Sequence, residues 1–505
     1  MTLIQPVLLE RLAERFPDGV AWKNMADGRE LRMGEWHSRS NRLARGMRAR
    51  GLSPGDRVAL AITPDEPLEW LISYMAIHKA GCVAVPLNTR LSQSELRRIL
   101  QLAEPKLLLA SAGLLDGAAN AGQPGALIAT TGGPGPSGIA WDDLLDEDGS
   151  DIGHPLQADD VADIMYTSGT TGVPKGVVVR HGGLSSNDRV PTEWNGLGFL
   201  TSSPFSTTTG SLLVCGPMRG GMSGWFLPKF NPEPWLRMVE TDRPGVAFLV
   251  PAMMQLVVAN PYFERADLSS LSIVSVGSAP IASETLRRFG SRAPSAEIMI
   301  GYGMTEFGAA TSLPIGDAGR HLGSVGTALP GVTIHIVDHA GTQCATGQVG
   351  QIVLSGDRPQ RAYFNEFEES RHTWKDGWLQ SGDLGYLDAD DYLWVVGRMK
   401  ETIIRGGHNI MPGEVESALF AHPAVADAAV AGVPHEVLGE DVAAWIVLRR
   451  AGSTSVDAIR AFLLERLADY KVPRRITFVD DLPRNEAGKV LKSRLKVDDA
   501  ARSTT

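Results

Sequence analysis

The sequence is poor in cysteine, in long apolar runs and in positive charge, and each shortage excludes a class of protein. Its three cysteines, Cys82, Cys215 and Cys344, lie far apart with no His or Cys neighbour at ligand spacing, so we expect reduced thiols packed in a core and not disulfides or a zinc site. No apolar run reaches the roughly 18 residues of a membrane-spanning helix. The N-terminus lacks the basic and apolar segments of an export signal. These absences predict a cytoplasmic chain without a membrane span.

The balance of charge and hydrophobicity is that of an acidic globular protein. The net charge is −10, which argues against a general nucleic-acid-binding surface. Hydrophobic residues make up 43% and charged residues 21% of the chain, so disorder is not expected. A length of 505 residues leaves room for roughly two to four units with cores of their own.

The first half of the chain alternates strand-like and helix-like runs. Strand-like runs at 57–62 and 82–86 flank a helix-like run at 67–79, a βαβ rhythm that predicts parallel strands covered by helices. Residues 112–160 are rich in Gly, Ala, Pro and Asp and predict loops around one or two short helices. The alternation then resumes and continues to about residue 315.

The pattern changes twice in the second half. From 325 to 397, short strands separated by glycines predict a small β-rich subdomain. From about residue 400, the pattern predicts a separate α+β unit of ordinary domain size. Its expected elements are a turn at Gly406 and Gly407, helices at 412–420 and 456–470, and strands at 425–430 and 442–448.

Residues 166–176 read YTSGTTGVPKG and combine three glycines, four aliphatic hydroxyls and one lysine. Glycines let a backbone approach a charged ligand closely, while hydroxyls, amide N–H groups and an ammonium neutralise phosphate oxygens. Apolar runs at 161–165 and 177–179 predict flanking strands. No Gly-Lys-hydroxyl triplet closes a Walker pattern. The segment therefore predicts a polyphosphate-binding loop of another kind.

Three further motifs carry chemistry. Residues 301–306 read GYGMTE after an apolar run, and an aromatic, a hydroxyl and a carboxylate there can stack a purine, hold a phosphate oxygen and bind a hard cation. Residues 377–385 read GWLQSGDLG and present Asp383 from a glycine turn, where it can accept two vicinal ribose hydroxyls. Residues 483–490 display Lys489 just after a glycine turn, and one lysine can screen two anionic reactants.

In this order the motifs resemble those of the adenylate-forming superfamily of acyl-CoA synthetases, carrier-loading adenylation domains and luciferases. The resemblance covers nearly the whole chain. It implies an acid–thiol ligase that uses ATP and Mg²⁺ to convert a carboxylic acid to acyl-AMP and pyrophosphate, and then transfers the acyl group to coenzyme A. It also implies a large α/β domain at 1–397 with parallel-rich sheets, a hinge at 398–401 centred on Lys400, and a mobile lid domain at 402–505.

The resemblance assigns roles to individual residues. Lys489, Thr305 and Glu306 are expected to be catalytic, with Thr305 at the α-phosphate and Glu306 at Mg²⁺. Residues expected to contact ATP or AMP are Thr167, Ser168, Gly169, Thr170, Thr171, Gly172, Lys175, Ser278, Ala279, Pro280, Gly301, Tyr302, Gly303, Met304, Asp383 and Arg398. Lys175 is expected to position the β- and γ-phosphates, whereas Lys489 acts at the α-phosphate.

The acyl site differs from the family pattern. Residues 201–210, TSSPFSTTTG, stand where many acyl-CoA synthetases have P-L-F-H-x-x-G, and the histidine position is Thr207. A small hydroxyl there leaves a roomier pocket than an imidazole would, which favours a bulky or branched apolar acid. It also leaves open whether this chain performs the thioester step. No Asp or Glu occurs between 201 and 227, which disfavours an α-amino acid because its buried ammonium needs a carboxylate. The expected acyl pocket contains Phe205, Thr207, Thr208, Gly277 and Gly301.

The C-terminal unit carries the residues expected to serve thioester formation, which are Gly406, Gly407 and Lys471. His408 stands where the family usually has Glu, and we expect it to be exposed. Residues 471–496 hold eight basic and three acidic side chains, either a docking surface for coenzyme A phosphates or a solvated basic face. An adenylating enzyme that passes acyl-AMP to a carrier or partner protein, a non-catalytic nucleotide-binding protein, and a homodimer also stay open.

Overall fold

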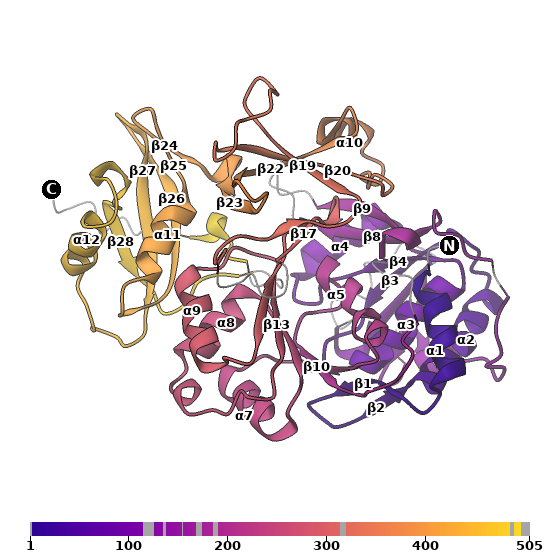
Figure 1. The fold of residues 1–505 in the computed structure, drawn as a ribbon. Helices are drawn as coiled ribbons and strands as arrows, with labels where there is room; N and C mark the ends of the chain where they lie inside the picture. Colours follow the sequence, from indigo (N-terminus) through magenta and orange to yellow (C-terminus); the bar gives the residue numbers. More distant parts are fainter. Residues whose placement is uncertain are drawn as a thin grey trace.

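The computed structural model describes residues 3–114, 126–134, 138–153, 155–167, 174–184, 190–313, 320–484 and 489–495. They form two seven-stranded sheets, two five-stranded sheets and two small ribbons of two strands. In Figure 1 the C-terminal part, in orange and yellow, stands at the opposite end of the molecule from the indigo N-terminal helices. The predicted α/β fold with parallel-rich sheets is confirmed.

The first sheet has the strand order β7-β6-β5-β3-β4-β8-β9, and all its pairs are parallel except β8 with β9. The predicted βαβ unit is confirmed, because the parallel neighbours β3 and β4 are joined by α3 (Pro67–Lys79). The strands are β3 (Arg57–Ala61), β4 (Val83–Pro86), β5 (Leu107–Ser111), β6 (Leu127–Thr131), β7 (Ile139–Ala140), β8 (Val161–Thr167) and β9 (Lys175–Arg180).

The stretch 112–160 contains more regular structure than its composition predicts. Strands β6 and β7 extend the first sheet there, beside one-turn helices at Ala112–Leu114 and Trp141–Leu144. The prediction of loops around short helices was wrong for these strands. β6 pairs along its whole length with β5 and is buried from residue 128 onward, and this tertiary burial outweighs the flanking Gly and Pro.

The second sheet has the order β14-β13-β12-β10-β11-β1-β2, and only β2 is antiparallel to its neighbour. The alternation predicted up to about residue 315 is found in this sheet, where β12, β13 and β14 are successive parallel neighbours. The strands are β1 (Val20–Asn24), β2 (Glu30–Arg32), β10 (Gly198–Thr201), β11 (Ser223–Phe226), β12 (Val246–Leu249), β13 (Ile273–Val276) and β14 (Glu297–Ile300).

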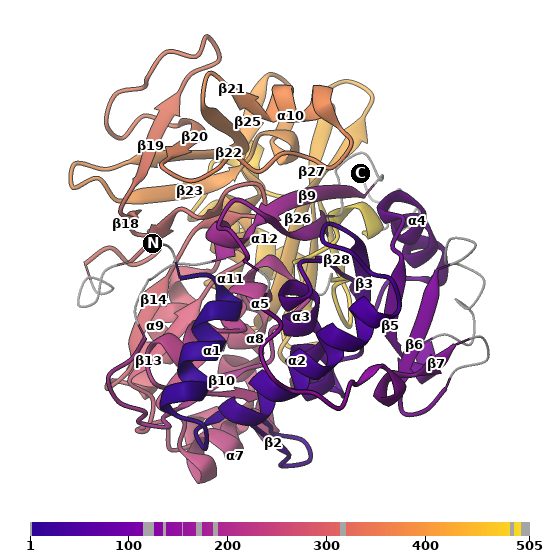
Figure 2. The same cartoon turned by 90° about the vertical axis from the view of Figure 1, so that its right-hand side faces the viewer.

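Helices cover these sheets in layers. α1 (Gln5–Arg15), α2 (Met33–Ala49) and α3 lie side by side and share one hydrophobic core with residues of both large sheets (Figure 2). α3 is buried at almost every position, which suits its apolar sequence on all faces. The remaining layers are α4 (Gln93–Ala103) on the other face of the first sheet, and α7 (Pro232–Asp242), α8 (Pro251–Ala259) and α9 (Ser283–Arg292) on the second.

The β-rich subdomain predicted at 325–397 is an antiparallel sheet of five strands with α10 (Phe367–Thr373) beside it. Two ribbons connect it to the second sheet along the chain. The strands are β15 (Gly303–Met304), β16 (Gly308–Ala309), β17 (Thr311–Ser312), β18 (Thr327–Ala328), β19 (Val332–Val337), β20 (Gly350–Gly356), β21 (Trp374–Lys375), β22 (Trp378–Leu387) and β23 (Leu393–Arg398).

The C-terminal unit has its own sheet and core. Its predicted first helix is α11, whereas α12 is shorter than predicted: the chain leaves the helix after Leu464, and Leu467 and Val472 then pack into the core. Contacts of α11 with α9 and β23, and of β26 with α8, join this unit to the rest. The elements are β24 (Ile403–Arg405), β25 (His408–Ile410), α11 (Pro412–Phe420), β26 (Val425–His435), β27 (Gly439–Leu448), α12 (Val456–Leu464) and β28 (Arg475–Phe478).

All three cysteines are free thiols, as predicted. Cys82 and Cys215 are buried, and burial raises the pKa of each to about 12. Cys344 is partly exposed. No helix within the described ranges is both long and apolar enough to cross a membrane.

Lys79 is an unusual core residue at the end of α3, only 5% exposed. Its Nζ donates to Asn41 Oδ1 at 2.7 Å and to the His37 carbonyl at 3.1 Å, both on α2. Burial lowers the pKa of Lys79 to about 7. Burial and the neighbouring Lys79 lower the pKa of His37 to about 4. The contact between α2 and α3 therefore contains an amine that is half neutral near pH 7.

This amine predicts a pH-dependent stability. Between pH 7 and pH 9 the unfolded chain keeps a proton that folded Lys79 loses, so the free energy of unfolding rises with pH, by about 2 kcal/mol from this group. Lys79→Met should lose that part of the rise, as urea unfolding at the two pH values would measure. Lys106→Met, which removes an exposed lysine, is the matched control and should keep the wild-type rise. Equal rises in the wild type and Lys79→Met would contradict the assignment.

Candidate active site

Three of the predicted motif segments leave the second sheet at one edge. Strands β10, β13 and β14 are parallel, so their carboxyl ends lie on the same side of the sheet. The segments that follow them are 202–210, 277–280 and 301–306. Because ligands of open α/β sheets bind beyond the carboxyl ends of strands, the fold gathers these segments where a substrate would bind.

The predicted phosphate loop joins β8 to β9, and Thr167 and Lys175 face each other at its base. Lys175 forms an ion pair with Glu369 of α10, and its Nζ lies 5.5 Å from the centre of the Tyr363 ring. The base of the loop is thus tied to the β-rich subdomain. The predicted residues at its tip, Ser168, Gly169, Thr170, Thr171 and Gly172, lie outside the described residues.

Glu306 lies in the turn between β15 and β16, and its Oε1 accepts a hydrogen bond from Tyr363 Oη at 2.9 Å. Burial and the Glu306 carboxylate raise the pKa of Tyr363, so its hydroxyl stays a donor. Tyr363 therefore contacts both the predicted metal ligand Glu306 and the predicted phosphate-positioning Lys175.

Asp383 is the best-buried carboxylate of the site, 5% exposed. Its Oδ2 accepts from Tyr302 Oη at 2.6 Å, and its Oδ1 accepts from Arg398 Nε at 2.8 Å. The contact with Arg398 follows from the register of β22 and β23, in which Asp383 and Arg398 are direct partners. Burial, with Asp383 beside it, raises the pKa of Tyr302, and the carboxylates of Asp383 and Glu401 raise that of Arg398 against the effect of burial.

Two threonines of the 202–210 segment bind residues of the predicted nucleotide site. Thr208 Oγ1 shares a hydrogen bond of 2.8 Å with Thr305 Oγ1, and Thr209 Oγ1 shares one of 3.0 Å with Ser278 Oγ. Ser278 has φ of +77°, so the turn before Ala279 and Pro280 is sharply bent. The segment expected to hold the acid thus touches the residues expected at the α-phosphate and the adenine.

Thr207, at the family's histidine position, caps α5 (Thr208–Leu213). Its Oγ1 accepts from the Gly210 backbone N–H at 3.0 Å and donates to the Pro204 carbonyl at 2.9 Å. Both bonds are local, so the hydroxyl is used to close the turn. The side chain therefore does not replace an imidazole that projects toward a substrate.

Three of the predicted site residues are glycines, and they differ in how much room a side chain would have. A Cβ on Gly277 would lie 3.8 Å from the Phe248 ring and 4.0 Å from the Gly301 carbonyl, in ordinary contact. A Cβ on Gly301 would lie 3.0 Å from the Thr311 carbonyl. A Cβ on Gly303 would collide with the Gly308 carbonyl at 2.4 Å, so the β15–β16 ribbon requires glycine before Met304. A Cβ at Gly277 would thus fit beside an aromatic ring without a collision.

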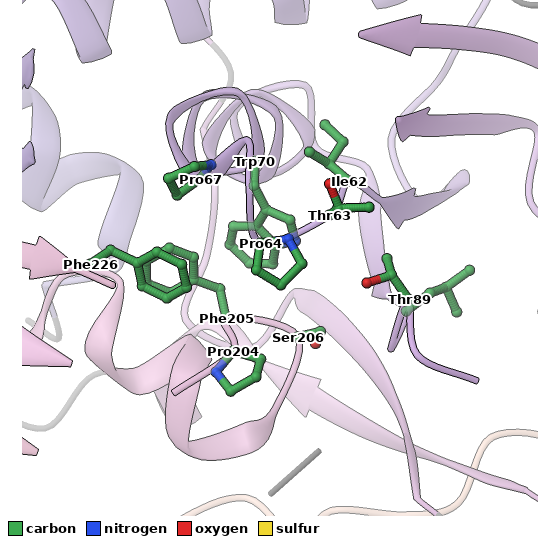
Figure 3. Close-up of a pocket in the computed structure, with 11 residues that line it drawn as sticks. Ile62, Thr63, Pro64, Pro67, Trp70, Thr89, Pro204, Phe205, Ser206 and Phe226 are labelled. Atoms are coloured by element: carbon green, nitrogen blue, oxygen red, sulfur yellow. The ribbon is translucent and has the colours of Figure 1, made fainter. Parts of the chain in front are cut away.

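Phe205 packs among other aromatic side chains. Its ring stacks on Phe226 at 4.6 Å between centroids, meets Trp22 edge-on at 4.9 Å and lies 5.2 Å from Trp70. Figure 3 shows it among residues that line a small cavity of about 20 Å³. Phe205 thus packs in the core and also lines this cavity, and its place in the acyl pocket stays a prediction.

Lys489 of the C-terminal unit reaches the Asp383 cluster. Its Nζ lies 3.6 Å from Glu401 Oε1. Burial and the nearby Arg398 guanidinium lower the pKa of Lys489, while Glu401 and Asp383 act in the opposite direction. The predicted catalytic lysine and the predicted ribose ligand, over 100 residues apart in sequence, are therefore electrostatic neighbours.

The other predicted C-terminal residues form a separate group. Gly406 and Gly407 have φ of +56° and +86° and make the turn between β24 and β25. His408 is exposed, as predicted, and stacks on the Tyr470 ring at 4.4 Å. Lys471 Nζ contacts both carboxylate oxygens of Glu414, at 2.6 and 2.8 Å. Lys400 lies in the one-turn helix Met399–Glu401 that follows β23.

Sequence reasoning missed Arg361, which is only 6% exposed. It donates to the Thr305 carbonyl at 2.8 Å and to the Gly183 carbonyl at 2.9 Å, and so fixes the backbone of the GYGMTE segment. Burial and the like charge of Arg358 lower its pKa to about 10, still well above neutral pH. Its segment has no glycine turn or recurring motif, so the pattern gave no signal; its contact with the turn that carries Glu306 exists only in three dimensions.

The carboxylate of Glu306 fits a magnesium site. In the described part of the chain, no cluster of three or more His, Cys, Asp or Glu side chains is placed to hold a metal by itself. Mg²⁺ in nucleotide sites is held by one or two carboxylates plus substrate phosphates, so a single glutamate beside Thr305 suits it. When bound, the ion would neutralise phosphate charge.

Two family descriptions match the chain. Residues 9–364 match the AMP-binding enzyme family, and residues 414–489 match the C-terminal domain of AMP-binding enzymes. Among curated relatives, a feruloyl-CoA synthase of an Amycolatopsis species is 34% identical over 486 residues, covering 93% of this chain and 94% of the relative. An indoleacetate–CoA ligase of Aromatoleum aromaticum is 32% identical, covering 95% and 94%.

Solved structures agree. ATP-bound MatB from Rhodopseudomonas palustris superposes with a TM-score of 0.86 at 33% identity, covering 98% of both chains. The anthranilate CoA ligase AuaEII in complex with anthranoyl-AMP gives 0.87 at 25% identity, covering 97% of this chain and 96% of that one. The site, the family matches and these likenesses lead to one conclusion. The chain belongs to the AMP-binding enzyme family and is an adenylate-forming acid–thiol ligase of the acyl-CoA synthetase type, with ATP, Mg²⁺ and coenzyme A as its nucleotide, metal and thiol.

Proposed function

We propose that the acid activated by this ligase is bulky and apolar, with aryl acids the first class to test. The observation that carries the proposal is the absence of a side chain at Gly277, where a Cβ would lie in ordinary contact with the Phe248 ring and the Gly301 carbonyl. An aromatic ring beside a glycine suits a flat apolar acid. Thr207 supports this, because its hydroxyl is occupied in capping α5. Three similar proteins are named for ferulate, indoleacetate and anthranilate, which are all acids with an aryl group.

The absence of acidic residues between 201 and 227 argues against amino acids. The only charged side chain in that stretch is Arg219. A bound α-ammonium there would lack a carboxylate from this segment, and an unpaired buried charge is costly. Acids that carry no charged group besides the reacting carboxylate are therefore favoured.

In the first half-reaction, a carboxylate oxygen of the acid attacks the α-phosphorus of ATP, and pyrophosphate leaves. Asp383 accepts the ribose hydroxyls, exchanging its contacts with Tyr302 and Arg398 for the ligand. Thr305 donates to the α-phosphate, and its bond to Thr208 keeps the acid segment and the phosphate in register. Lys489 places a cation beside both anions as charge builds up.

In the second half-reaction, the thiol attacks the acyl carbonyl and AMP leaves. We propose that the C-terminal unit turns about Lys400 between the two steps, bringing the Gly406 and Gly407 turn toward the acyl group. Coenzyme A carries the acyl group away. A carrier protein as the final acceptor is the alternative favoured by the missing histidine at Thr207. Homodimer formation and a cytoplasmic location stay predictions.

A panel of carboxylic acids tests the substrate class. Aryl and branched acids should give higher kcat/KM than linear acids of two to four carbons, by about tenfold or more, because each buried methylene adds to binding. Pyrophosphate release, acyl-AMP and acyl-CoA are measured separately for each acid. Best use of short linear acids would refute the proposal, and acyl-AMP that accumulates without acyl-CoA would favour the carrier alternative.

Gly277→Val fills the space beside Phe248 without requiring an unusual backbone. KM for a bulky acid should rise about tenfold, while KM for a small acid should change little. Steady-state kinetics with both acids measure the difference. Gly113→Val, a glycine with open space around its Cβ position, is the matched control and should change neither value. A uniform loss for both acids would argue against a pocket at Gly277.

Lys489→Ala tests the role of the lysine. Adenylation, followed by pyrophosphate release, should slow at least tenfold because the transition-state charge loses its screening cation. Lys375→Ala, which removes an exposed lysine of the β-rich subdomain, should retain the wild-type rate. A Lys489→Ala variant within threefold of the wild type would contradict the proposed mechanism.

A further inference from the structure

In the proposed adenylation step, Lys489 is the cation that the C-terminal unit contributes. Both positive and negative side chains surround it. Arg398 of β23 is a nearby like charge, which works against a protonated amine. Asp383 of β22 and Glu401 of the one-turn helix after β23 are the nearby carboxylates. Asp383, however, is already engaged with Arg398 and Tyr302 and is expected to take the ribose. Glu401 is the carboxylate that remains for the lysine when nucleotide is bound.

Glu401 divides its two oxygens between two lysines. Oε1 lies 3.6 Å from Lys489 Nζ, and Oε2 lies 3.4 Å from Lys492 Nζ. Lys492 Nζ also contacts Glu416 Oε1 of α11 at 3.0 Å, and that same oxygen accepts from the Val430 backbone N–H at 2.8 Å. The chain of contacts thus runs from the lysine at the site to the core sheet of the C-terminal unit.

The position of Glu401 in the chain makes this contact useful. Glu401 directly follows Lys400, so it lies on the C-terminal side of the expected hinge residue and travels with Lys489 when that unit turns. A pair on one side of a hinge is preserved through the motion, whereas a pair across it is broken. The lysine therefore arrives at the nucleotide already oriented.

We propose that Glu401 is a positioning residue for adenylation, holding the ammonium group of Lys489 in place through a carboxylate that Lys492 and Glu416 anchor. This inference rests on the proposed role of Lys489 and extends it. Burial and Arg398 lower the pKa of Lys489, and Glu401 acts against both. The carboxylate therefore both orients the amine and keeps it charged at working pH.

The test compares pH profiles of adenylation in Glu401→Gln, Glu401→Asp and the wild type, followed by pyrophosphate release. Glu401→Gln should lower kcat about three- to tenfold with little change in the KM for ATP, because the pair is partly exposed and acts on the lysine only. The basic limb of its pH–rate profile should move to lower pH by about 0.5 to 1 unit, because the lysine loses the carboxylate that favours its charged form. Glu401→Asp, which keeps the charge, should restore most of that shift.

Two further variants sharpen the result. Lys492→Met removes a competing ammonium and should move the basic limb to higher pH, opposite to Glu401→Gln. Glu465→Gln, which removes an exposed carboxylate paired with Arg466, is the matched control and should leave the profile unchanged. The second half-reaction from supplied acyl-AMP should keep its wild-type rate in Glu401→Gln, which a general loss of folding would not allow.

The outcomes separate this inference from the proposed function. If Lys489→Ala slows adenylation but Glu401→Gln leaves kcat and the basic limb at wild-type values, the positioning role is overturned and the ligase mechanism stands. If Lys489→Ala has no effect, the proposed mechanism fails first. A downward shift in Glu401→Gln with rescue by Glu401→Asp supports the inference.

Discussion

The site is organised around one buried carboxylate, Asp383. A carboxylate that is only 5% exposed needs partners for its charge, and the fold supplies a tyrosine hydroxyl from the segment between β14 and β15 and a guanidinium from the next strand of the β-rich sheet. These two contacts join the GYGMTE segment, the subdomain and the start of the hinge at one point. Arg398 is the last residue of β23 and the first of the predicted hinge at 398–401. The predicted ribose ligand Asp383 is therefore paired directly with a residue of the predicted hinge.

The threonine segment shows how a departure from a family motif is accommodated. Thr207 uses its hydroxyl to cap a short helix, and the next two threonines bond to the predicted phosphate and adenine residues. Three consecutive threonine hydroxyls thus hold this loop in place, at the position where the family pattern has a histidine. A stabilised loop and the absence of a side chain at Gly277 are consistent with an acid that fills space by its own bulk rather than by polar contacts with the protein.

Much of the fold was predictable, and the misses have physical causes. The helix of residues 67–79 and the strands around it follow from the alternation of helix-like and strand-like apolar runs along the chain, which is a local signal. Strand β6 was missed because its burial against β5 is a tertiary effect, and α12 was predicted too long because the exit at Glu465 depends on core packing. At the site, motif order singled out Asp383 and Lys489, which the fold brings near each other, whereas Arg361 carries no motif and the core packing of Phe205 has no sequence signal. Residue types reveal chemistry, but side-chain direction is decided by packing.

In the proposed mechanism, Asp383, Arg398 and Lys489 together surround the ribose and the α-phosphate during adenylation. A crystal structure with a non-hydrolysable acyl-adenylate analogue tests it most directly. We expect both ribose hydroxyls within hydrogen-bond distance of the Asp383 carboxylate, and Lys489 Nζ within hydrogen-bond distance of the oxygens that mimic the reacting groups. An analogue bound at the same strand edge with its ribose away from Asp383, or bound elsewhere on the chain, would contradict it.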